Sequence, residues 1–314
     1  MNRRDFLRTA TAAAVLPSIV RAADDESPIP VIDTHTHFYD PTRPEGVPWP
    51  RPTESEIYST HLPTAFHKAF GAIPVLGTVV VEASPWLEDN QWLLDLARSN
   101  SDIVGIVGSL KPGEPEFARQ LKRFAANPLF RGIRIGAGTV TTVGQAAVMT
   151  DLGRLASANL SLDVIGRGPI VEGTQQIARK WPNLRIIVNH LPFPEWDGNV
   201  PALREGLAGL AKQRNVFVKV SAVVRRVDGR IVDDPESHRP ALDALFELFG
   251  PDRLVYGSDW PVCTKVAPYG TVHRIVAEYF GTRGRAAAEK YFWRNSHAAY
   301  RWVPRGPAAL LHLG

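Results

Sequence analysis

The sequence predicts a single-domain α/β protein of the (β/α)8 TIM-barrel class. Eight short runs rich in β-branched and apolar residues recur along the chain, and stretches with helical periodicity separate most of them. Residues 23–314 are also long enough for this fold, which commonly takes about 250 residues or more. Alternating strands and helices favour parallel strands joined by right-handed crossovers. A doubly wound open sheet is the alternative fold.

The expected strands and helices can be placed in order along the chain. Strands are expected at residues 31–37, 76–83, 103–110, 130–136, 160–165, 185–190, 215–221 and 253–259. Helical periodicity is clearest over 91–98, 116–126, 174–180, 202–213 and 239–249.

Composition narrows the class of protein. The chain has 314 residues, is 44% hydrophobic and 22% charged, and has one cysteine, Cys263, so disulfide pairing within the chain and cysteine-based zinc sites are excluded. Residues 1–22 carry four arginines against one aspartate, which leaves a net charge of +1 of the total +4 for the rest of the chain. With so small a net charge, residues 23–314 show no basic surface of the kind that binds nucleic acid or membranes, so a small-molecule substrate is the expected partner. The oligomeric state stays undetermined.

The N-terminus predicts export. Asn2-Arg3-Arg4-Asp5-Phe6-Leu7-Arg8 is a twin-arginine pattern, followed by an apolar stretch over 10–20 and a small-residue cleavage site at Val20-Arg21-Ala22. We expect residues 1–22 to be a signal peptide and the protein to be periplasmic or secreted, with no membrane anchor. An ordinary basic N-terminal helix is the alternative.

Polar residues gather where the predicted strands end. These residues are His35 and His37, Glu82, Arg134, His190, Lys219 and Ser221, and Asp259. Parallel strands buried on both faces should be almost wholly apolar, and active sites of barrels lie at the carboxyl ends of the strands. This placement of polar residues therefore predicts an active site at the carboxyl ends of the strands.

Four of these side chains have the donor types of a metal site. His35 and His37 lie on one face of the first strand, because side chains alternate with a period of two. With His190 and Asp259 they form an N/O ligand set that suits Zn²⁺ or Mn²⁺. Histidines satisfied by ordinary hydrogen bonds are the alternative.

Several motifs together resemble a known family. These are His35-Thr36-His37, residues 79–85, 130–134 and 216–221, Asn189-His190-Leu191-Pro192, and above all residues 254–263, LVYGSDWPVC. The sequence resembles the amidohydrolase superfamily over residues 30–302, and within it the amidohydrolase-2 branch that includes pyrone-dicarboxylate lactonase and lactonases acting on fuconolactone and rhamnonolactone.

The resemblance implies a hydrolase that opens a lactone or related cyclic ester. Binuclear members carry a carboxylated lysine on strand four and a histidine on strand five, where this chain has Arg134 and Asp163. The resemblance therefore implies at most one bound divalent metal, and lactonases of this branch can act without a tightly bound one.

The same resemblance suggests roles for individual residues. Asp259 is the expected general base, with His190 as a second catalytic residue, and Arg134, Lys219, Glu82 and Trp260 are expected to bind substrate. For Lys219, an internal ion pair with a carboxylate such as Asp163 is the alternative. For Glu82 and Asp163, a structural role as the partner of another side chain is as plausible as a role in the active site.

Two loops and two further functions stay open. The proline-rich loop over 41–52 and the loop over 222–238, with Arg225, Arg226 and Arg230, are candidates for substrate selection. A metal-dependent decarboxylase of an aromatic or unsaturated acid occurs in the same branch and would be expected to have an extra histidine near Lys219. A non-catalytic sugar-acid binding protein is the third possibility.

Overall fold

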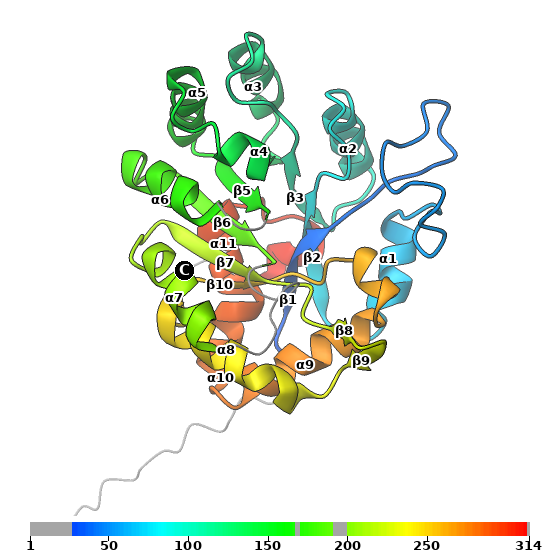
Figure 1. The fold of residues 1–314 in the computed structure, drawn as a ribbon. Helices are drawn as coiled ribbons and strands as arrows, with labels where there is room; N and C mark the ends of the chain where they lie inside the picture. The colour runs from blue at the N-terminus through cyan, green and yellow to red at the C-terminus, as the bar shows by residue number, and fades with distance from the viewer. Residues whose placement is uncertain (1–26, 167–169, 191–199, 313–314) are drawn as a thin grey trace, which may run out of the picture.

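Eight parallel strands form one barrel in the computed structural model, which describes residues 27–166, 170–190 and 200–312 (Figure 1). The strand order is β1-β2-β3-β4-β5-β6-β7-β10. A parallel bridge between Thr36 and Trp260 joins β1 to the segment after β10. The strands are β1 (Val31–Thr36), β2 (Val75–Val81), β3 (Ile103–Gly108), β4 (Phe130–Gly136), β5 (Ser161–Ile165), β6 (Arg185–Asn189), β7 (Val216–Val220) and β10 (Leu254–Tyr256).

The predicted barrel and its eight strands are confirmed, and six of the strands end one to three residues earlier than the sequence suggested. The last strand differs most, because it ends at Tyr256 instead of residue 259. At Gly257 the chain passes so close to β1 that a Cβ there would lie 2.7 Å from Cβ of His35. Only glycine fits at this approach, and the chain leaves the ladder here with Asp259 turned toward β1.

Helices surround the barrel, as Figure 1 shows. All five expected helices are present, and α1, α4, α5 and α9 to α11 were not anticipated. The helices are α1 (Pro63–Phe70), α2 (Asp89–Arg98), α3 (Phe117–Ala125), α4 (Ala137–Val140), α5 (Ala146–Ser157), α6 (Ile170–Lys180), α7 (Val200–Ala211), α8 (Pro235–Phe249), α9 (Tyr269–Gly281), α10 (Arg285–Glu289) and α11 (Asn295–Tyr300). Short 3₁₀ turns occupy Val262–Lys265 and Gly306–Leu310, and a π-helical turn occupies Lys290–Arg294.

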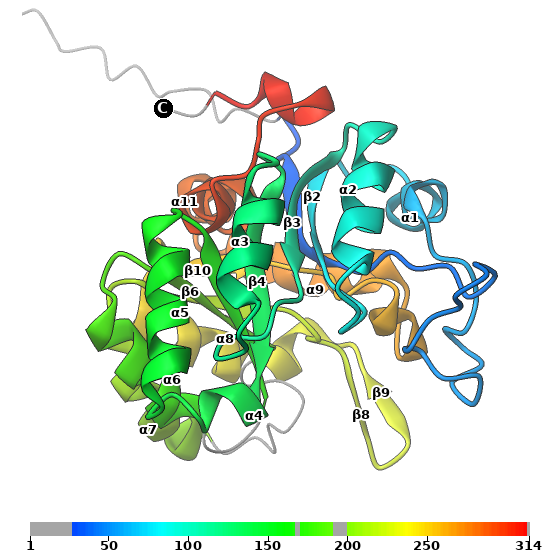
Figure 2. The ribbon, with the colours of Figure 1, turned by 90° about the horizontal axis from the view of Figure 1, so that it is seen from above.

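The loop expected over 222–238 contains a small hairpin, β8 (Arg225–Val227) and β9 (Arg230–Val232). Its turn residues, Asp228 and Gly229, have φ values of 49° and 78°. An Asp-Gly pair accepts the left-handed backbone that a tight hairpin needs. Figure 2 shows the hairpin projecting from one end of the barrel, away from the C-terminal segment at the other end.

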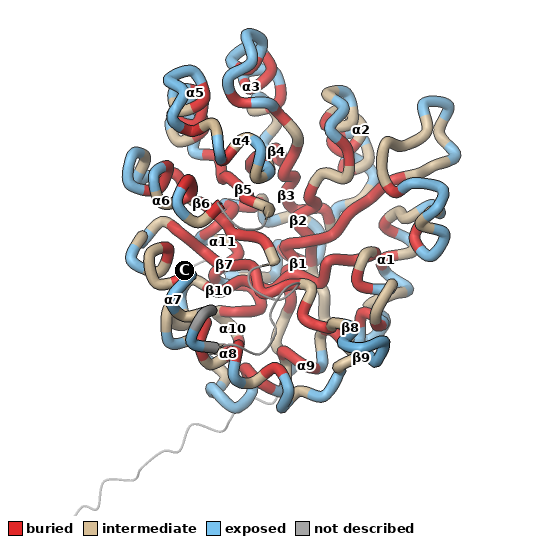
Figure 3. The backbone as a smooth tube through the Cα atoms, viewed as in Figure 1, coloured by how far each residue is buried: buried red, intermediate tan, exposed pale blue. Residues whose placement is uncertain are grey.

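The strands are buried on both faces, as the burial colouring in Figure 3 shows. One apolar cluster lies between strands and helices, and a second fills the barrel interior. The interior cluster includes Ile32, Val79, Val81, Val104, Val107, Ile187, Phe217 and Val255, together with Trp293, Tyr300 and Trp302 from the C-terminal region. The interior is therefore packed mainly with apolar side chains.

The predicted signal peptide over 1–22 and its boundary lie outside the described residues, so both stay predictions. Within the described part of the chain, no helix combines the length and apolar character that crossing a bilayer requires.

Candidate active site

Three predicted residues meet at the mouth of the barrel. One carboxylate oxygen of Asp259, Oδ1, lies 3.5 Å from Nε2 of His35 and 3.5 Å from Nε2 of His37. All three residues are buried. The two histidines come from the end of β1, where the pairing register with β2 shifts between Asp33 and Thr36. Such irregularities re-aim side chains next to active sites.

His190 lies beside this group, at a slightly larger distance. Its Nε2 is 3.9 Å from Oδ1 of Asp259, and its ring centroid is 4.5 Å from that of His35. Its Nδ1 lies 2.8 Å from Oγ of Ser221, which orients the ring. The four expected ligands therefore share one region, but the set of atoms within 4.8 Å of one another comprises only His35, His37 and Asp259 among the described residues.

The backbone at two of these residues is unusual. Asp259 has φ of 64° and His190 has φ of 57°, in the left-handed region that few non-glycine residues adopt. The Asp259 N–H donates to the carbonyl oxygen of His35 at 2.9 Å, so the conformation is held by a hydrogen bond between β1 and the segment that follows β10. Such conformations cost free energy and cluster at active sites.

Electrostatics keep the Asp259 carboxylate charged and the imidazoles of His35 and His190 neutral. Burial raises the pKa of Asp259, but His190, His37 and Arg134 more than offset this and leave that pKa below its ordinary value. Burial lowers the pKa of His190 to about 4, against the opposing effect of Asp259. Burial, and then the charge of Lys219, lowers the pKa of His35 well below the usual range. The site thus holds an ionised carboxylate at neutral pH, as a general base requires.

By donor type and spacing, this group could hold a single divalent cation. Imidazole nitrogens and a carboxylate oxygen are common ligands of Zn²⁺. Within the described part of the chain, Nε2 of His35 is buried without a hydrogen-bond partner, and a metal would satisfy this atom. Nδ1 of His37 lies 2.9 Å from the carbonyl oxygen of Val81. Because a carbonyl only accepts, Nδ1 of His37 carries the proton and Nε2 is free to act as a ligand.

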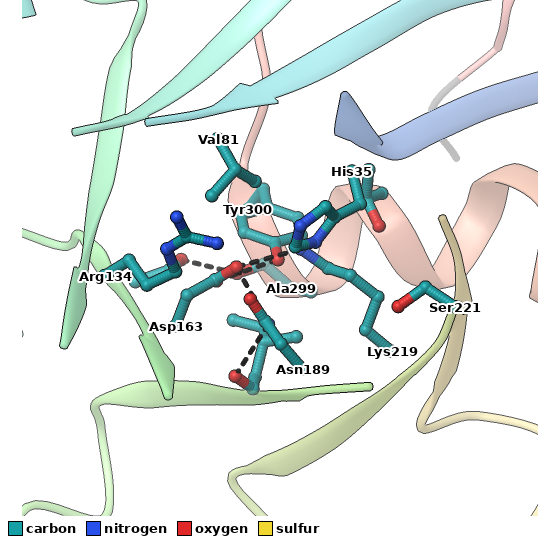
Figure 4. A network of polar contacts seen from close by, with 12 residues as sticks. His35, Val81, Arg134, Asp163, Asn189, Lys219, Ser221, Ala299 and Tyr300 are labelled. Atoms are coloured by element: carbon teal, nitrogen blue, oxygen red, sulfur yellow. Dashed lines mark hydrogen bonds and ion pairs between the residues drawn. The ribbon is translucent and has the colours of Figure 1, made fainter. Parts of the chain in front are cut away.

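Below the histidines lies a buried polar network, shown in Figure 4. Nζ of Lys219 is 2.8 Å from Oδ2 of Asp163 and 3.2 Å from Nδ1 of His35, and neither Lys219 nor Asp163 is exposed. Lys219 is therefore absent from the described lining of the pocket above the histidines. The ion pair with Asp163 is the alternative to substrate binding that the sequence suggested for Lys219. A direct contact with substrate would require Lys219 to leave this pair.

A pocket of about 320 Å³ opens above the group. Its described lining consists of His37, Trp49, Ala83, Arg134, Ile165, His190, Asp259 and Val262. Trp49 comes from the proline-rich loop, which the sequence marked for substrate selection. The Arg134 guanidinium donates through Nε to Oε1 of Glu82 at 2.8 Å and through Nη2 to the Glu82 carbonyl at 2.7 Å. Arg134 therefore faces the pocket, and Glu82 orients it from behind.

Trp260, expected to bind substrate, is 3% exposed and does not line this pocket. Its ring packs against Phe38, Phe66 and His61. Its carbonyl oxygen accepts from the N–H of His37 at 2.8 Å. In this structure Trp260 thus supports the end of β1.

Two residues of the site were not assigned a role from the sequence. Oδ1 of Asp33 accepts from the N–H groups of His35 and Ser258, each at 3.0 Å, and Oδ2 accepts from the Tyr269 hydroxyl at 3.1 Å. The hydroxyl of Tyr300 donates to Oδ1 of Asp163 at 2.8 Å. A charged residue inside the buried first strand could have indicated Asp33. Tyr300 gives no comparable signal.

Comparisons with known proteins agree on one family. The amidohydrolase-2 family model, described as amidohydrolase, matches residues 32–302. The chain is 27% identical to an L-fucono-1,5-lactonase of Burkholderia ambifaria over 243 residues, 76% of this chain and 83% of that protein. It is also 27% identical to an L-fucono-1,5-lactonase of Burkholderia multivorans over 293 residues, 89% of this chain and 98% of that protein.

Solved structures show the same fold. An amidohydrolase from Burkholderia multivorans, crystallised with bound zinc, superposes with a TM-score of 0.77 at 24% identity, covering 87% of this chain and 99% of that one.

Proposed function

The chain belongs to the amidohydrolase-2 family, and from this premise we propose that it is a hydrolase that opens a lactone, with sugar lactones as the substrate class. One observation carries the proposal: the carboxylate of Asp259, with its lowered pKa, lies 3.5 Å from both His35 and His37 in the floor of an open pocket. The two fuconolactonases that the chain resembles over most of its length support the substrate class.

In the proposed reaction, Asp259 takes a proton from a water molecule while the water oxygen bonds to the lactone carbonyl carbon. The carbonyl π electrons move to its oxygen, giving a tetrahedral oxyanion. When the oxyanion collapses, the ring C–O bond breaks, and the leaving ring oxygen takes the proton that Asp259 accepted. The product is a hydroxy acid, and Asp259 returns to its ionised state.

Arg134 is the cationic side chain of the described pocket lining. Two of its nitrogens are engaged by Glu82, which fixes the guanidinium plane and leaves Nη1 without a partner among the described residues. A donor held in advance at this position can bind a substrate hydroxyl or stabilise the developing oxyanion without reorganisation.

His37, Asp259 and His35 are the residues that would hold a divalent metal. When bound, such an ion would polarise the lactone carbonyl and acidify a water molecule. The roles of Asp259 as base and of Arg134 as donor are the same with or without it.

The decisive experiment is hydrolysis of a lactone panel by the purified protein, followed as acid release. The panel holds 1,4- and 1,5-sugar lactones and carboxylated cyclic esters, each assayed with chelator and with added Zn²⁺ or Mn²⁺. We expect turnover of at least one sugar lactone by the wild-type protein and much slower turnover of the same lactone by Asp259→Asn. Release of carbon dioxide from hydroxybenzoates without lactone hydrolysis would favour the decarboxylase, and saturable sugar-acid binding without turnover would favour a binding protein.

A further inference from the structure

Four basic side chains lie together at the end of the barrel opposite the active site. Arg131 is the second residue of β4, Arg185 is the first residue of β6, and His297 and Arg301 lie in and directly after α11. We call these four residues the basic cluster. Figure 2 shows α11 at the end of the barrel where the C-terminal segment lies, and the β8–β9 hairpin at the other end. Because the active site lies where the strands finish, the strands separate it from the basic cluster.

The buried ring of Trp302 holds several of these side chains in one place. A Cβ placed on Gly105 would lie 3.0 Å from Cγ of Arg131 and 3.6 Å from Cβ of Trp302, so Arg131 and Trp302 pass over the same glycine of β3. The His297 ring meets the Trp302 ring edge-on, with 5.0 Å between the centroids. Arg301 directly precedes Trp302 in the chain. Arg131, His297 and Arg301 therefore surround one fixed aromatic side chain.

Arg185 is held by carbonyl groups instead of a carboxylate. Its Nε donates to the carbonyl oxygen of Ala299 at 2.9 Å, and its Nη1 and Nη2 donate to Oδ1 and to the carbonyl oxygen of Asn159, each at 2.6 Å. A guanidinium has five N–H groups, so Arg185 keeps two of them for another partner. Ala299 lies between His297 and Arg301 in the chain, so its contact with Arg185 places this arginine beside them.

The basic cluster has no counter-charge among the described residues. Its three arginines form no ion pair there, and the side chains of Arg131 and Arg301 form no hydrogen bond there. Nε of Arg131 is buried without a partner in the same part of the chain. Burial, and then the charges of Arg301 and Arg131, lower the pKa of Arg185 to about 10. Burial, and then the charges of all three arginines, lower the pKa of His297. The cationic groups are thus close enough to repel one another.

We propose that the basic cluster binds one tetrahedral oxyanion of the phosphate type, at a site separate from the active site. Half-buried like charges are costly unless an opposite charge offsets them. Arg301 is exposed and the other three residues are partly exposed, so an ion can reach them from solvent.

The donor set favours phosphate over a carboxylate as the ligand. Guanidinium groups present planar arrays of N–H donors that match the oxygens of phosphate, often two at a time. A phosphate group offers more oxygen atoms and more negative charge than a carboxylate, which suits three arginines without an acidic neighbour. The ligand can be the free ion or the phosphate group of a small monoester. Because its arginines come from β4, β6 and the segment after α11, the bound anion would join these three segments.

The first test is calorimetric titration of the purified protein with inorganic phosphate, in a buffer free of phosphate and sulfate. We expect saturable binding of one phosphate per chain, and no saturable binding of chloride at matched ionic strength. Glycerol 3-phosphate, titrated in parallel, distinguishes the two sources. Equal affinity for both supports a site that accepts monoesters, and much weaker binding of the ester supports a site for the free ion. Absence of saturable phosphate binding overturns the proposal.

Variants locate the bound phosphate. Arg131→Met and Arg301→Met should each raise the Kd for phosphate about 10-fold or more, because each removes charge-assisted hydrogen bonds. Arg98→Met removes an exposed arginine from α2 and should leave this Kd unchanged. Arg134→Met removes the cation of the active-site pocket and should also leave it unchanged. Phosphate binding that is lost in Arg134→Met and kept in Arg131→Met would place the anion in the active site and overturn the proposal.

Thermal unfolding of Arg301→Met gives a second readout. Without phosphate, this variant loses one of the mutually repelling charges and should be at least as stable as the wild-type protein. In saturating phosphate the wild-type protein should be the more stable one, because a ligand that binds only the folded state raises its stability. An equal loss of stability in both conditions would mean that Arg301 has only a structural role, and it overturns the proposal. Arg301 is exposed, so its replacement should not prevent folding. None of these measurements depends on lactone hydrolysis.

Discussion

The main-chain N–H of Asp259 donates to the carbonyl oxygen of His35 across 2.9 Å, so β1 and the segment after β10 are joined at two residues that the site requires. Asp33 reinforces this junction, because one of its oxygens accepts from His35 and from Ser258. The hydrogen bonds that close the barrel therefore also fix the positions of the site residues. A change that loosens the closure should also displace the general base.

Asp33→Ala is expected to lower both stability and activity. It leaves the N–H groups of His35 and Ser258 and the hydroxyl of Tyr269 without their acceptor, and each buried unsatisfied group costs about 1–3 kcal/mol. Urea denaturation measures the loss of unfolding free energy. Asp95→Ala, at an exposed ion pair in α2, should change it by less than about 1 kcal/mol. Equal stability of the two variants would contradict this account.

Asp259→Asn is expected to lower kcat for lactone hydrolysis by about 10²–10⁴, the usual contribution of a general base. The amide can keep the main-chain bond to His35, so the unfolding midpoint should change little. Initial rates of acid release on the best lactone of the panel provide the measurement. Near-normal turnover by this variant would exclude Asp259 as the base.

Arg134 and Glu82 should differ in their effects on the kinetic constants. Arg134→Met removes a donor from the pocket lining, so KM should rise if the guanidinium binds substrate, and kcat should fall if it stabilises the oxyanion. Glu82→Gln keeps an acceptor for Arg134 and should cause a smaller change of the same kind. A Glu82→Gln effect larger than that of Arg134→Met would show that Glu82 acts on its own.

The barrel could be predicted because its strands are buried on both faces and so form apolar runs that end in polar residues. β4, for example, was placed at its observed bounds, Phe130–Gly136. Partners distant in the sequence could be named only as alternatives, as Asp163 was for Lys219. Strand alternation points Lys219 inward, but only the folded chain shows whether it meets a substrate or Asp163, 56 residues away. The Asp228-Gly229 pair is a sequence signal for the turn of the β8–β9 hairpin. The residues on either side of it are too polar to suggest strands, so the hairpin was not predicted.

We propose that residues 1–22 direct export through the twin-arginine route, because Arg3 and Arg4 precede an apolar stretch of modest hydrophobicity. Replacing both arginines with lysine should leave the precursor inside the cell. Fractionation, with sequencing of the mature N-terminus near Ala23, measures this. Unchanged export of the double-lysine variant would remove the twin-arginine interpretation.

The pH dependence of lactone hydrolysis tests the charge states at the site. The pKa of Asp259 lies below its ordinary value, and the pKa of His190 is lowered to about 4. Both groups are therefore in their basic forms above about pH 5, more than one unit from either pKa. As the pH falls, Asp259 gains a proton and loses its capacity as base, while His190 becomes cationic. The enzymatic rate, corrected for spontaneous hydrolysis, should thus rise with pH up to about pH 5. A second, smaller rise is expected near pH 6, because burial raises the pKa of Asp33 to about 6, and the rate should then stay level to about pH 7.5. A single rise centred near pH 6.5, the ordinary value for histidine, with no rise below pH 5, would instead mean that an unburied imidazole controls the rate, contrary to this structure.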